Sequence, residues 1–541
     1  MTAAALLLVA AIAQAAQAPP RDLPPAVASA PAAQLTGRVI TTDNQRLQRA
    51  VVRLTSSSLA APRVLRTDLE GRFTFNKLPP GRFTLRASKP GFLTLEYGQR
   101  RPFESGRRLE IRAAEQLRNV DVVLPKAAAI SGVVLDDGGD PAAQMWVVAA
   151  RAGFREGRRQ LLPLVTTLTN DIGEFRLAGL APGDYFVVAK ERDMRVGDTS
   201  DDRTGFETTY HPGTASPAEA QPIRLALGQE VVNVSLTMLG VRTGTVTGRV
   251  VDTAGAPVTG VRVSMAETYA STITAGNIVG AASVNGEGRF RITGARPGRW
   301  VLFSSRGTTD NAEVPIEIGG GETQDVTLVL GPGGTLAGRI VDDTGTALAP
   351  QVLAETELRL VVPRDRQVRS YSTTRPRTDG AFEWHNVLAS AVIRPARLPE
   401  GFWLKAIVRG DTDVTDTPLD ITHSATVSNL AIVLAGRGAT VSGDVLNDGK
   451  PEADYTVILF PAERKPPAAL DRLVRAERPD HKGSFRITGI PPGEWLAAAV
   501  EYVEDGQWLD PAYLDTLRAG AVPMTLAAPS STSIVLHLNR R

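Results

Sequence analysis

Between Thr67 and Ala87 the chain reads Thr67-Asp-Leu-Glu-Gly-Arg-Phe-Thr-Phe75, then Leu78-Pro-Pro-Gly-Arg-Phe-Thr-Leu-Arg-Ala87. Apolar and polar residues alternate in both halves, as in Phe73-Thr-Phe75 and Phe83-Thr-Leu85. Alternation places every second side chain on one face of a strand, as in a sheet with one buried side. A glycine or a Pro-Gly pair precedes each run and supplies the backbone angles of a tight turn. The stretch therefore predicts two strands, each preceded by a turn.

The same pattern recurs along the chain. It is found at Asp171–Tyr185, Gly286–Trp300 and Lys482–Trp495. A fourth occurrence is interrupted, because an insertion separates Asp379–Trp384 from Leu398–Trp403. Trp300, Trp403 and Trp495 would then share the position of Phe83 and Tyr185, the first inward position after the turn. We expect all five of these side chains in cores.

Two further signatures frame each copy, an opening strand with a central glycine and an alternating closing strand. The opening glycines are 95, 116, 90 and 105 residues apart, about one domain length, at Gly37, Gly132, Gly248, Gly338 and Gly443. Each closing strand, for example Val326–Leu330, runs almost directly into the next opening strand, so linkers are short. The predicted β-sandwich domains are 35–126, 127–240, 241–332, 333–436 (degenerate) and 437–541.

The opening is most complete in the third copy, Gly248-Arg-Val-Val-Asp-Thr-Ala-Gly-Ala-Pro257. With the D-x-x-G-x-F and L-P-P-G-x-Y patterns that follow, it resembles the carboxypeptidase regulatory-like domain. The resemblance implies a transthyretin-like β-sandwich, often found in tandem in exported bacterial proteins and classed with carbohydrate-binding-like folds. It also implies a domain that accompanies a peptidase without cleaving. The expected fold is all-β, a tandem array of five Ig-like or transthyretin-like sandwiches, with one helix expected within Pro467–Arg478.

The composition is that of a folded, soluble chain. Of 541 residues, 43% are hydrophobic and 22% charged, close to the globular average. The 60 Lys and Arg nearly balance the 58 Asp and Glu and are interspersed with them, so no basic face for nucleic acid is indicated. Cysteine is absent, which excludes disulfides and thiolate metal sites.

The N-terminal segment predicts export. Residues 1–18 are apolar and end in Ala16-Gln17-Ala18, which is typical of a signal peptide with its cleavage site. Residues 19–34 form a leader rich in proline and alanine, expected to be extended. No later stretch is long and apolar enough to cross a bilayer. We expect location in the periplasm, on the outer cell surface or in the medium.

The sequence lacks the motifs that are typical of catalytic and metal-binding sites. The histidines, His211, His385, His423, His481 and His537, begin no H-x-x-E or H-E-x-x-H motif. No G-x-S-x-G elbow and no P-loop occurs. The acidic runs Asp136–Asp140 and Asp198–Asp202 lack the alternating spacing of a calcium loop and are interpreted as turns or solvated loops. We therefore predict no catalytic residue, metal or cofactor.

Aromatic residues in the longer inserts of copies one, two and five are the candidate binding residues. They are Tyr97, Tyr210, His211, Trp508 and Tyr513. Exposed aromatic side chains at one matching place in several modules would form a repeated contact site. The alternative is that they pack as plugs over open ends of the sandwiches.

The sequence thus favours a non-enzymatic structural or interaction protein that binds or spaces an envelope protein or another extracellular partner. The first alternative is carbohydrate binding through the aromatic inserts, and the second is a hydrolase without a recognisable motif. Five compact domains in line would reach on the order of 170 Å, so we expect a rod or curved string.

Overall fold

The computed structural model describes residues 33–155, 157–192, 204–267, 278–362, 371 and 373–539. The signal peptide, nearly all of the leader and the acidic run Asp198–Asp202 lie outside the described residues. Within them strands dominate, and the prediction of an all-β chain is confirmed. The five predicted segments are called modules 1 to 5 below.

Module 1 contains two facing sheets, one centred on its opening strand. That sheet has the order β4-β1-β8, with β9 also paired to β1, and the other has the order β3-β2-β5-β6, with β7 paired to β5. The strands are β1 (Ala33–Ile40), β2 (Val51–Thr55), β3 (Arg63–Arg66), β4 (Arg72–Leu78), β5 (Gly81–Ser88), β6 (Leu95–Glu96), β7 (Leu109–Ile111), β8 (Gln116–Leu117) and β9 (Val122–Val123).

Module 2 repeats this plan with the sheets β13-β10-β18 and β12-β11-β14-β16, to which β17 adds at β14, and with a small β15-β19 ribbon. Its β11-β12 hairpin is longer than the matching β2-β3 hairpin. The strands are β10 (Ala128–Leu135), β11 (Met145–Arg155), β12 (Arg158–Leu168), β13 (Glu174–Leu180), β14 (Gly183–Glu191), β15 (Thr204–Phe206), β16 (Thr209–Tyr210), β17 (Ile223–Leu225), β18 (Glu230–Thr237) and β19 (Gly240–Arg242).

Module 3 joins its strands into one continuous order, β22-β21-β24-β25-β26-β20-β23, because β25 also pairs with the closing strand. Module 4 has the sheets β29-β27-β34-β31-β32 and β28-β30-β33. The elements are β20 (Gly244–Asp252), β21 (Arg262–Glu267), β22 (Ile278–Ser283), β23 (Arg289–Ala295), β24 (Gly298–Arg306), β25 (Asp310–Ile318), β26 (Thr323–Pro332), β27 (Gly334–Val341), α1 (Pro350–Glu355), β28 (Glu357–Val361), β29 (Ala381–Val387), β30 (Ala389–Arg397), β31 (Trp403–Arg409), β32 (Thr412–Asp413), β33 (Leu419–Ile421) and β34 (Thr426–Ala435).

Module 5 adds helices to the sandwich. Its strands follow the order β36-β35-β42-β40-β37-β38, with β39 paired to β35 and β41 to β40. The helix α2 (Pro467–Leu473) lies within the segment expected to be helical, whereas α3 (Pro511–Leu517) and α1 were not predicted. The strands are β35 (Ala439–Asn447), β36 (Lys450–Glu452), β37 (Thr456–Pro461), β38 (Arg475–Glu477), β39 (Phe485–Ile490), β40 (Gly493–Val500), β41 (Val522–Leu526) and β42 (Ser531–Asn539).

The opening glycine is explained by the pairing of opening and closing strands. In every module the opening strand runs parallel to the closing strand, for example β20 beside β26. A Cβ built on Gly248 would lie 1.9 Å from the carbonyl oxygen of Val326, and the glycines of the other four copies meet the closing strand at 1.8 to 2.3 Å. Only glycine allows this close approach of two backbones.

Five main clusters of buried apolar side chains each draw their residues from one module. Phe83, Tyr185, Trp300 and Trp495 are buried in four of them, at the predicted inward position. The prediction for Trp403 is wrong. The apparent insertion in module 4 is itself the strand β30, so Ala391 takes this position, paired with Leu419 as Phe83 is paired with Leu109.

Trp403 instead begins β31 and is half-buried, next to the closing strand. Because β29 turns directly into β30 without a Pro-Gly pair, the expected turn signal marks a different strand. The large aromatic side chains of this core are Trp384 and Phe382 on β29, whose rings are in edge contact.

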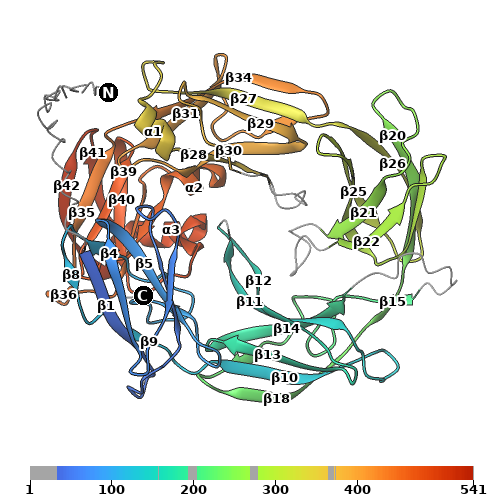
Figure 1. Cartoon of the computed structure of the whole chain (residues 1–541), viewed down its shortest axis with the longest axis horizontal. Coiled ribbons are helices and arrows are strands. Elements are labelled where there is room, and N and C mark those ends of the chain that lie inside the picture. The colour runs from blue at the N-terminus through green and yellow to red at the C-terminus, as the bar shows by residue number, and fades with distance from the viewer. Residues whose placement is uncertain are drawn as a thin grey trace, which may run out of the picture.

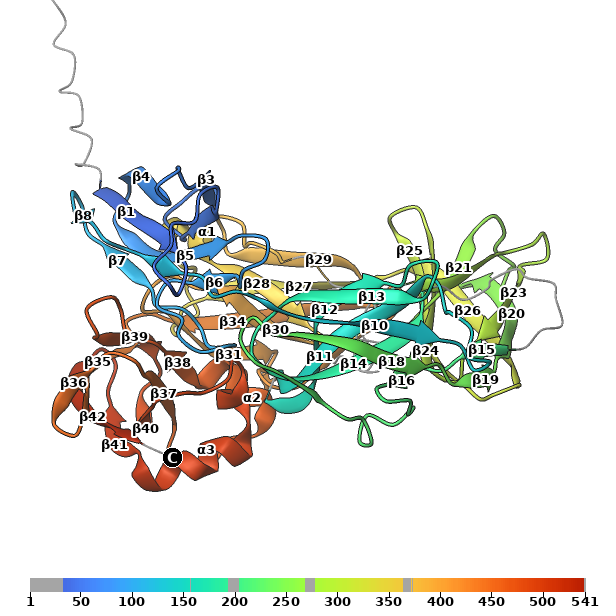
Figure 2. The same ribbon diagram turned by 90° about the horizontal axis from the view of Figure 1, so that it is seen from below.

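The modules form a closed ring and not an extended string (Figure 1). Modules 1 and 5 occupy the same part of the circumference, and from the side module 1 lies over module 5, so the ring resembles one turn of a spiral with overlapping ends (Figure 2). The short linkers expected from the sequence are present, for example Gly333 alone between β26 and β27. The expectation of a rod is not met, because the array curves until its two ends meet.

Candidate functional site

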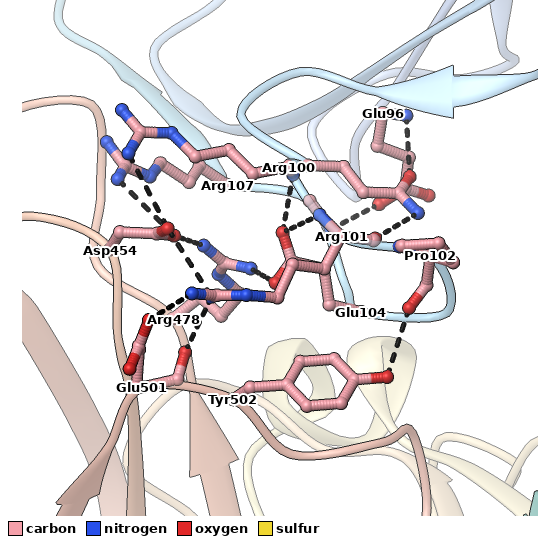
Figure 3. Close-up of polar contacts among 12 residues, drawn as sticks. Glu96, Arg100, Arg101, Pro102, Glu104, Arg107, Asp454, Arg478, Glu501 and Tyr502 are labelled. Carbon is pink, nitrogen blue, oxygen red and sulfur yellow. Dashed lines mark hydrogen bonds and ion pairs between the residues drawn. The ribbon is translucent and has the colours of Figure 1, made fainter. Parts of the chain in front are cut away.

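The ends of the ring meet through a loop of module 1 between β6 and β7, residues 98–108, which we call the closing loop (Figure 3). Its central contact is an ion pair of 2.8 Å between Glu104 Oε2 and Arg478 Nη1 of module 5. The two side chains are only 3% and 6% exposed. Without Arg478 the desolvated carboxylate of Glu104 would be a buried charge that lacks a counter-ion.

The closing loop is shaped around the same carboxylate. Glu104 Oε1 accepts hydrogen bonds from the backbone N–H groups of Arg100 and Arg101, the latter at 2.9 Å. A neighbouring carboxylate, Glu96 Oε2, accepts the N–H of Gly106 at 3.0 Å. Glu104 therefore both orders its own loop and joins that loop to module 5.

Module 5 contributes a second carboxylate, Asp454, to the same contact. Its Oδ1 lies 2.6 Å from Arg478 Nη2, and its Oδ2 lies 3.5 Å from both Arg100 and Arg101. Arg107, whose Nη2 is 3.9 Å from Asp454 Oδ1, also donates to the carbonyl of Ala453. Burial and the nearby positive charges of Arg478 and Arg100 lower the pKa of Arg107. Four arginine side chains therefore lie within 4 Å of the Asp454 carboxylate.

Tyr502 completes the contact on the other side of the loop. Its hydroxyl donates to the carbonyl of Pro102 at 3.1 Å, and the Arg101 guanidinium lies 5.8 Å from its ring centre. Burial raises the pKa of Tyr502 to about 12. Arg101 also pairs with the carboxylate of Glu501, as Figure 3 shows.

A third module joins at the same place. Arg151 on β11 of module 2 stacks its guanidinium 3.5 Å from the ring centre of Phe103 in the closing loop. Its Nη1 lies 3.2 Å from Glu504 Oε2 of module 5. The long β11-β12 hairpin therefore places module 2 against both ends of the chain.

Between modules 1 and 5 lies a hollow of about 220 Å³, lined in part by Glu96, Arg108, Glu477 and Trp508. Arg108 Nε is 3.8 Å from Glu477, yet burial outweighs this cation and raises the pKa of the Glu477 carboxyl. The hollow holds charged groups, but none of these residues forms a nucleophile and base pair. Its charged lining suits polar contacts.

The structure separates the five aromatic-insert residues instead of gathering them. Tyr97 packs against the module 1 core, and its backbone carbonyl accepts the N–H of Arg107 at the base of the closing loop. Trp508 and Tyr513 pack with the helices on the outer face of the module 5 sheet. Of these, Trp508 reaches the hollow beside the closing loop.

Tyr210 lies at a different junction, between modules 2 and 3, and His211 follows it in the chain. Tyr210 packs on Val148 and Val188 and is half-buried, and burial raises its pKa. His211 Nδ1 is 3.4 Å from the carbonyl of Gln221 within module 2. The predicted residues therefore belong to two sites, and binding by them stays a prediction.

Glu104, Asp454, Arg478 and Arg151 were missed from the sequence. The arginine pairs at 100–101 and 107–108 in one insert were a visible signal of a charged contact. Their partners lie more than three hundred residues away along the chain. No local pattern could indicate them.

Among the described residues no group of three or more histidines or acids could hold a metal ion. Asp136 has a turn role, because its Oδ1 accepts the N–H groups of Gly138 and Asp140 at 2.9 and 2.8 Å. In the same part of the chain, helices long and apolar enough to span a membrane are lacking.

Residues 34–125 match the carboxypeptidase regulatory-like domain. The resemblance drawn from the sequence is therefore confirmed for module 1. A domain of this kind fits a non-catalytic, structural protein. A comparison with curated proteins finds no match.

Solved structures with similarity include the Bacillus anthracis TIE protein, at 12% identity over 74% of this chain and 73% of that one, with a TM-score of 0.16. The Streptococcal ancillary pilin is 15% identical over 55% of this chain and 98% of its own, with a TM-score of 0.21. BcpA, the major pilin subunit of Bacillus cereus, is 10% identical over 55% and 99%, with a TM-score of 0.14. At these identities and TM-scores the likenesses carry no argument about function.

Proposed function

We propose that this chain, which contains a carboxypeptidase regulatory-like domain, is an exported, non-catalytic scaffold whose closed ring presents a composite surface to an envelope or extracellular partner. The contact between Glu104 and Arg478 carries the proposal, because it fixes the first module against the last. A closed ring holds surfaces of several modules at set distances, so that weak contacts can act together.

The proposal predicts that partner binding depends on the ring and not on any single module. Affinity-tagged full-length protein would be cross-linked in its native host and purified beside the ring-opening variant Glu104→Arg. The specific partner should be recovered with the wild type and lost from the variant, while a control at an exposed acid, Asp43→Arg, retains it. Equal recovery with all three proteins would contradict a composite surface.

Export has its own test. A fusion of residues 1–34 to alkaline phosphatase, which is active only after leaving the cytoplasm, should be active in a bacterial host. Replacing Leu7 and Leu8 with Arg should abolish that activity, because charges interrupt the apolar segment of a signal peptide. Activity unaffected by these charges would count against a signal peptide.

Glycan binding through the aromatic inserts stays the alternative. Tyr97 and Tyr513 are half-buried and pack against cores, so only part of each ring is open to a sugar. Glycan binding would be supported if the protein retains a polysaccharide and loses it when Tyr97, Tyr210 and Tyr513 are replaced with Ala in a variant that still folds. Failure to retain any glycan across a broad array would remove it.

A further inference from the structure

A second hollow, away from the ring closure, lies where modules 2 and 3 meet. Its volume is about 220 Å³. Module 2 contributes Val148, Val188 and Tyr210 to its lining, and module 3 contributes Glu267, Arg296 and Trp300. Apolar and aromatic surface with a few charged groups is the usual make-up of a small-molecule site, although this hollow is smaller than the usual range of roughly 300–1,000 Å³.

Its charged groups are deeply buried. Glu267 is shared by two cations, with Oε2 at 2.8 Å from Lys190 Nζ and Oε1 at 3.0 Å from Arg296 Nη2. Lys190 and Arg296 are each 2% exposed and Glu267 is 8% exposed. One carboxylate therefore serves as acceptor for both cations at the boundary of two modules.

Arg296 retains unused hydrogen-bonding capacity. Its Nε and Nη1 are buried and have no hydrogen-bond partner among the described residues. A buried donor without an acceptor costs about 1–3 kcal/mol, and more when the group is charged. The unpaired donors of Arg296 therefore point to an acceptor that the described residues do not supply.

The fold itself does not require an arginine here. In the turn before the inward aromatic residue, Tyr185, Trp300 and Trp495 each donate to the carbonyl of the residue four positions earlier. Those residues are Ala181, Arg296 and Pro491, so the turn needs only a backbone carbonyl. The side chain of Arg296 is therefore not needed for this turn. Its Nη2 pairs with Glu267 and its guanidinium lies 5.5 Å from the ring centre of Trp300, which leaves Nε and Nη1 without an acceptor among the described residues.

We propose that this hollow, the Arg296 site, binds a small carboxylate no larger than a monosaccharide or a single amino acid. A carboxylate matches the forked donors of a guanidinium in shape and charge. The body of the ligand would lie against Val148, Val188 and the aromatic rings of Tyr210 and Trp300. Arg299, with its side chain 74% exposed, stands at the rim and adds positive charge.

Two matched pairs of probes test the site on the full chain by saturation-transfer NMR and calorimetry. Glucuronate is compared with methyl glucoside, and N-acetylalaninate with N-acetylalaninamide, so that each carboxylate has a neutral partner and the two arms separate a sugar acid from an acylated amino acid. At least one carboxylate should bind at least tenfold more tightly than its neutral partner. Equal affinities within both pairs, or no binding of either carboxylate, would overturn the proposal.

Variants locate the binding. Arg296→Gln should weaken the bound carboxylate at least tenfold, whereas Arg262→Gln, an exposed arginine of the same module, should leave it unchanged. If Arg296→Gln proves unfolded by circular dichroism, Arg299→Glu replaces it, because a rim charge is changed without touching the core. A several-fold loss with Arg299→Glu supports the site. Affinity unchanged by the Arg299→Glu variant, or by folded Arg296→Gln, places the ligand elsewhere and refutes the assignment.

Discussion

The junctions of the ring are of two kinds. Modules 4 and 5 follow each other along the chain, and Arg394 on β30 is buried between them, donating to Asp471 at 3.0 Å and to Asp416 at 2.9 Å. Modules 1 and 5 have no linker, and the polar contacts between them centre on the closing loop. Both junctions place a buried arginine between carboxylates. Only at the junction of modules 4 and 5 does a linker hold the neighbouring module at high effective concentration.

We expect the linked junction to affect mainly the free energy of unfolding and the closing junction to affect mainly the shape of the molecule. Loss of contacts at a linked junction lowers the free energy of unfolding but leaves the modules adjacent. Loss of contacts at the closing junction frees the two ends, so the molecule can expand while every module stays folded. Changes at the two junctions should therefore be distinguishable by scattering and by thermal melting.

The largest effect is expected for Glu104→Arg. The variant removes one of the two carboxylates that pair with Arg478, the other being Asp454, and places a cation among Arg478, Arg100 and Arg107. The cost should be about 5 kcal/mol or more, since loss of one buried partner alone costs about 3–5 kcal/mol. Small-angle X-ray scattering should show an increase in maximum dimension, with unchanged strand content by circular dichroism. Asp43→Arg is the matched control and should leave the profile unchanged. An Arg478→Met variant that stays compact would contradict closure by this pair.

Next in size is Arg394→Met at the linked junction. Removing this cation leaves Asp471 and Asp416 facing each other near a buried surface and should destabilise the protein by about 3 kcal/mol. Arg472, 2.7 Å from Asp416, limits the loss. The melting temperature should fall while the scattering profile stays that of a closed ring. Expansion equal to that of Glu104→Arg would erase the distinction between the two junctions.

A smaller effect is expected for Arg151→Met, which removes the contact of module 2 with both chain ends. Loss of the stack on Phe103 and of the pair with Glu504 should cost about 1–2 kcal/mol, typical of a partly desolvated cation–π contact with a charged hydrogen bond. Hydrogen exchange should quicken in the closing loop, with the ring still closed at equilibrium. Unchanged exchange there would show that module 2 adds nothing to closure.

Salt should have little effect on shape. At 1 M ionic strength the Debye length is about 3 Å, so exposed pairs such as Arg101 with Glu501 are screened. The buried pair of Glu104 and Arg478 is screened much less. The scattering profile should therefore change little between 0.1 and 1 M NaCl. Opening by salt alone would show that the exposed pairs dominate.

The smallest effect concerns Glu477 in the hollow between modules 1 and 5. Burial raises its pKa, so the folded state binds this proton more tightly than the unfolded chain does. Its contribution to stability is greatest at low pH and is lost as pH rises from the unfolded pKa through the folded one. Glu477→Gln should raise the melting temperature slightly at pH 7, and not at pH 4, relative to wild type. A lower melting temperature at pH 7 would mean that the pair with Arg108 outweighs burial.

Local patterns determined the modules themselves. The alternation at Phe73-Thr-Phe75, the turn glycines and the opening glycines are properties of a few neighbouring residues, so strand, turn and the inward aromatic position could be predicted in four copies. The prediction was wrong for Trp403, because the Pro-Gly turn is missing from module 4 and a similar motif marks another strand. Domain boundaries stay a prediction from the repeats.

Tertiary structure decided how the modules are arranged. Curvature is set by how each module is oriented on the next, and that orientation depends on side chains such as Arg394 and Asn386 that have no repeated pattern. Glu104 and Arg478 are 374 positions apart, and nothing in either neighbourhood marks them as partners. The sequence by itself thus determined an all-β array of repeated modules, because strand and turn formation is local. Only the tertiary structure decided that the array closes into a ring, because closure depends on contacts between its two ends.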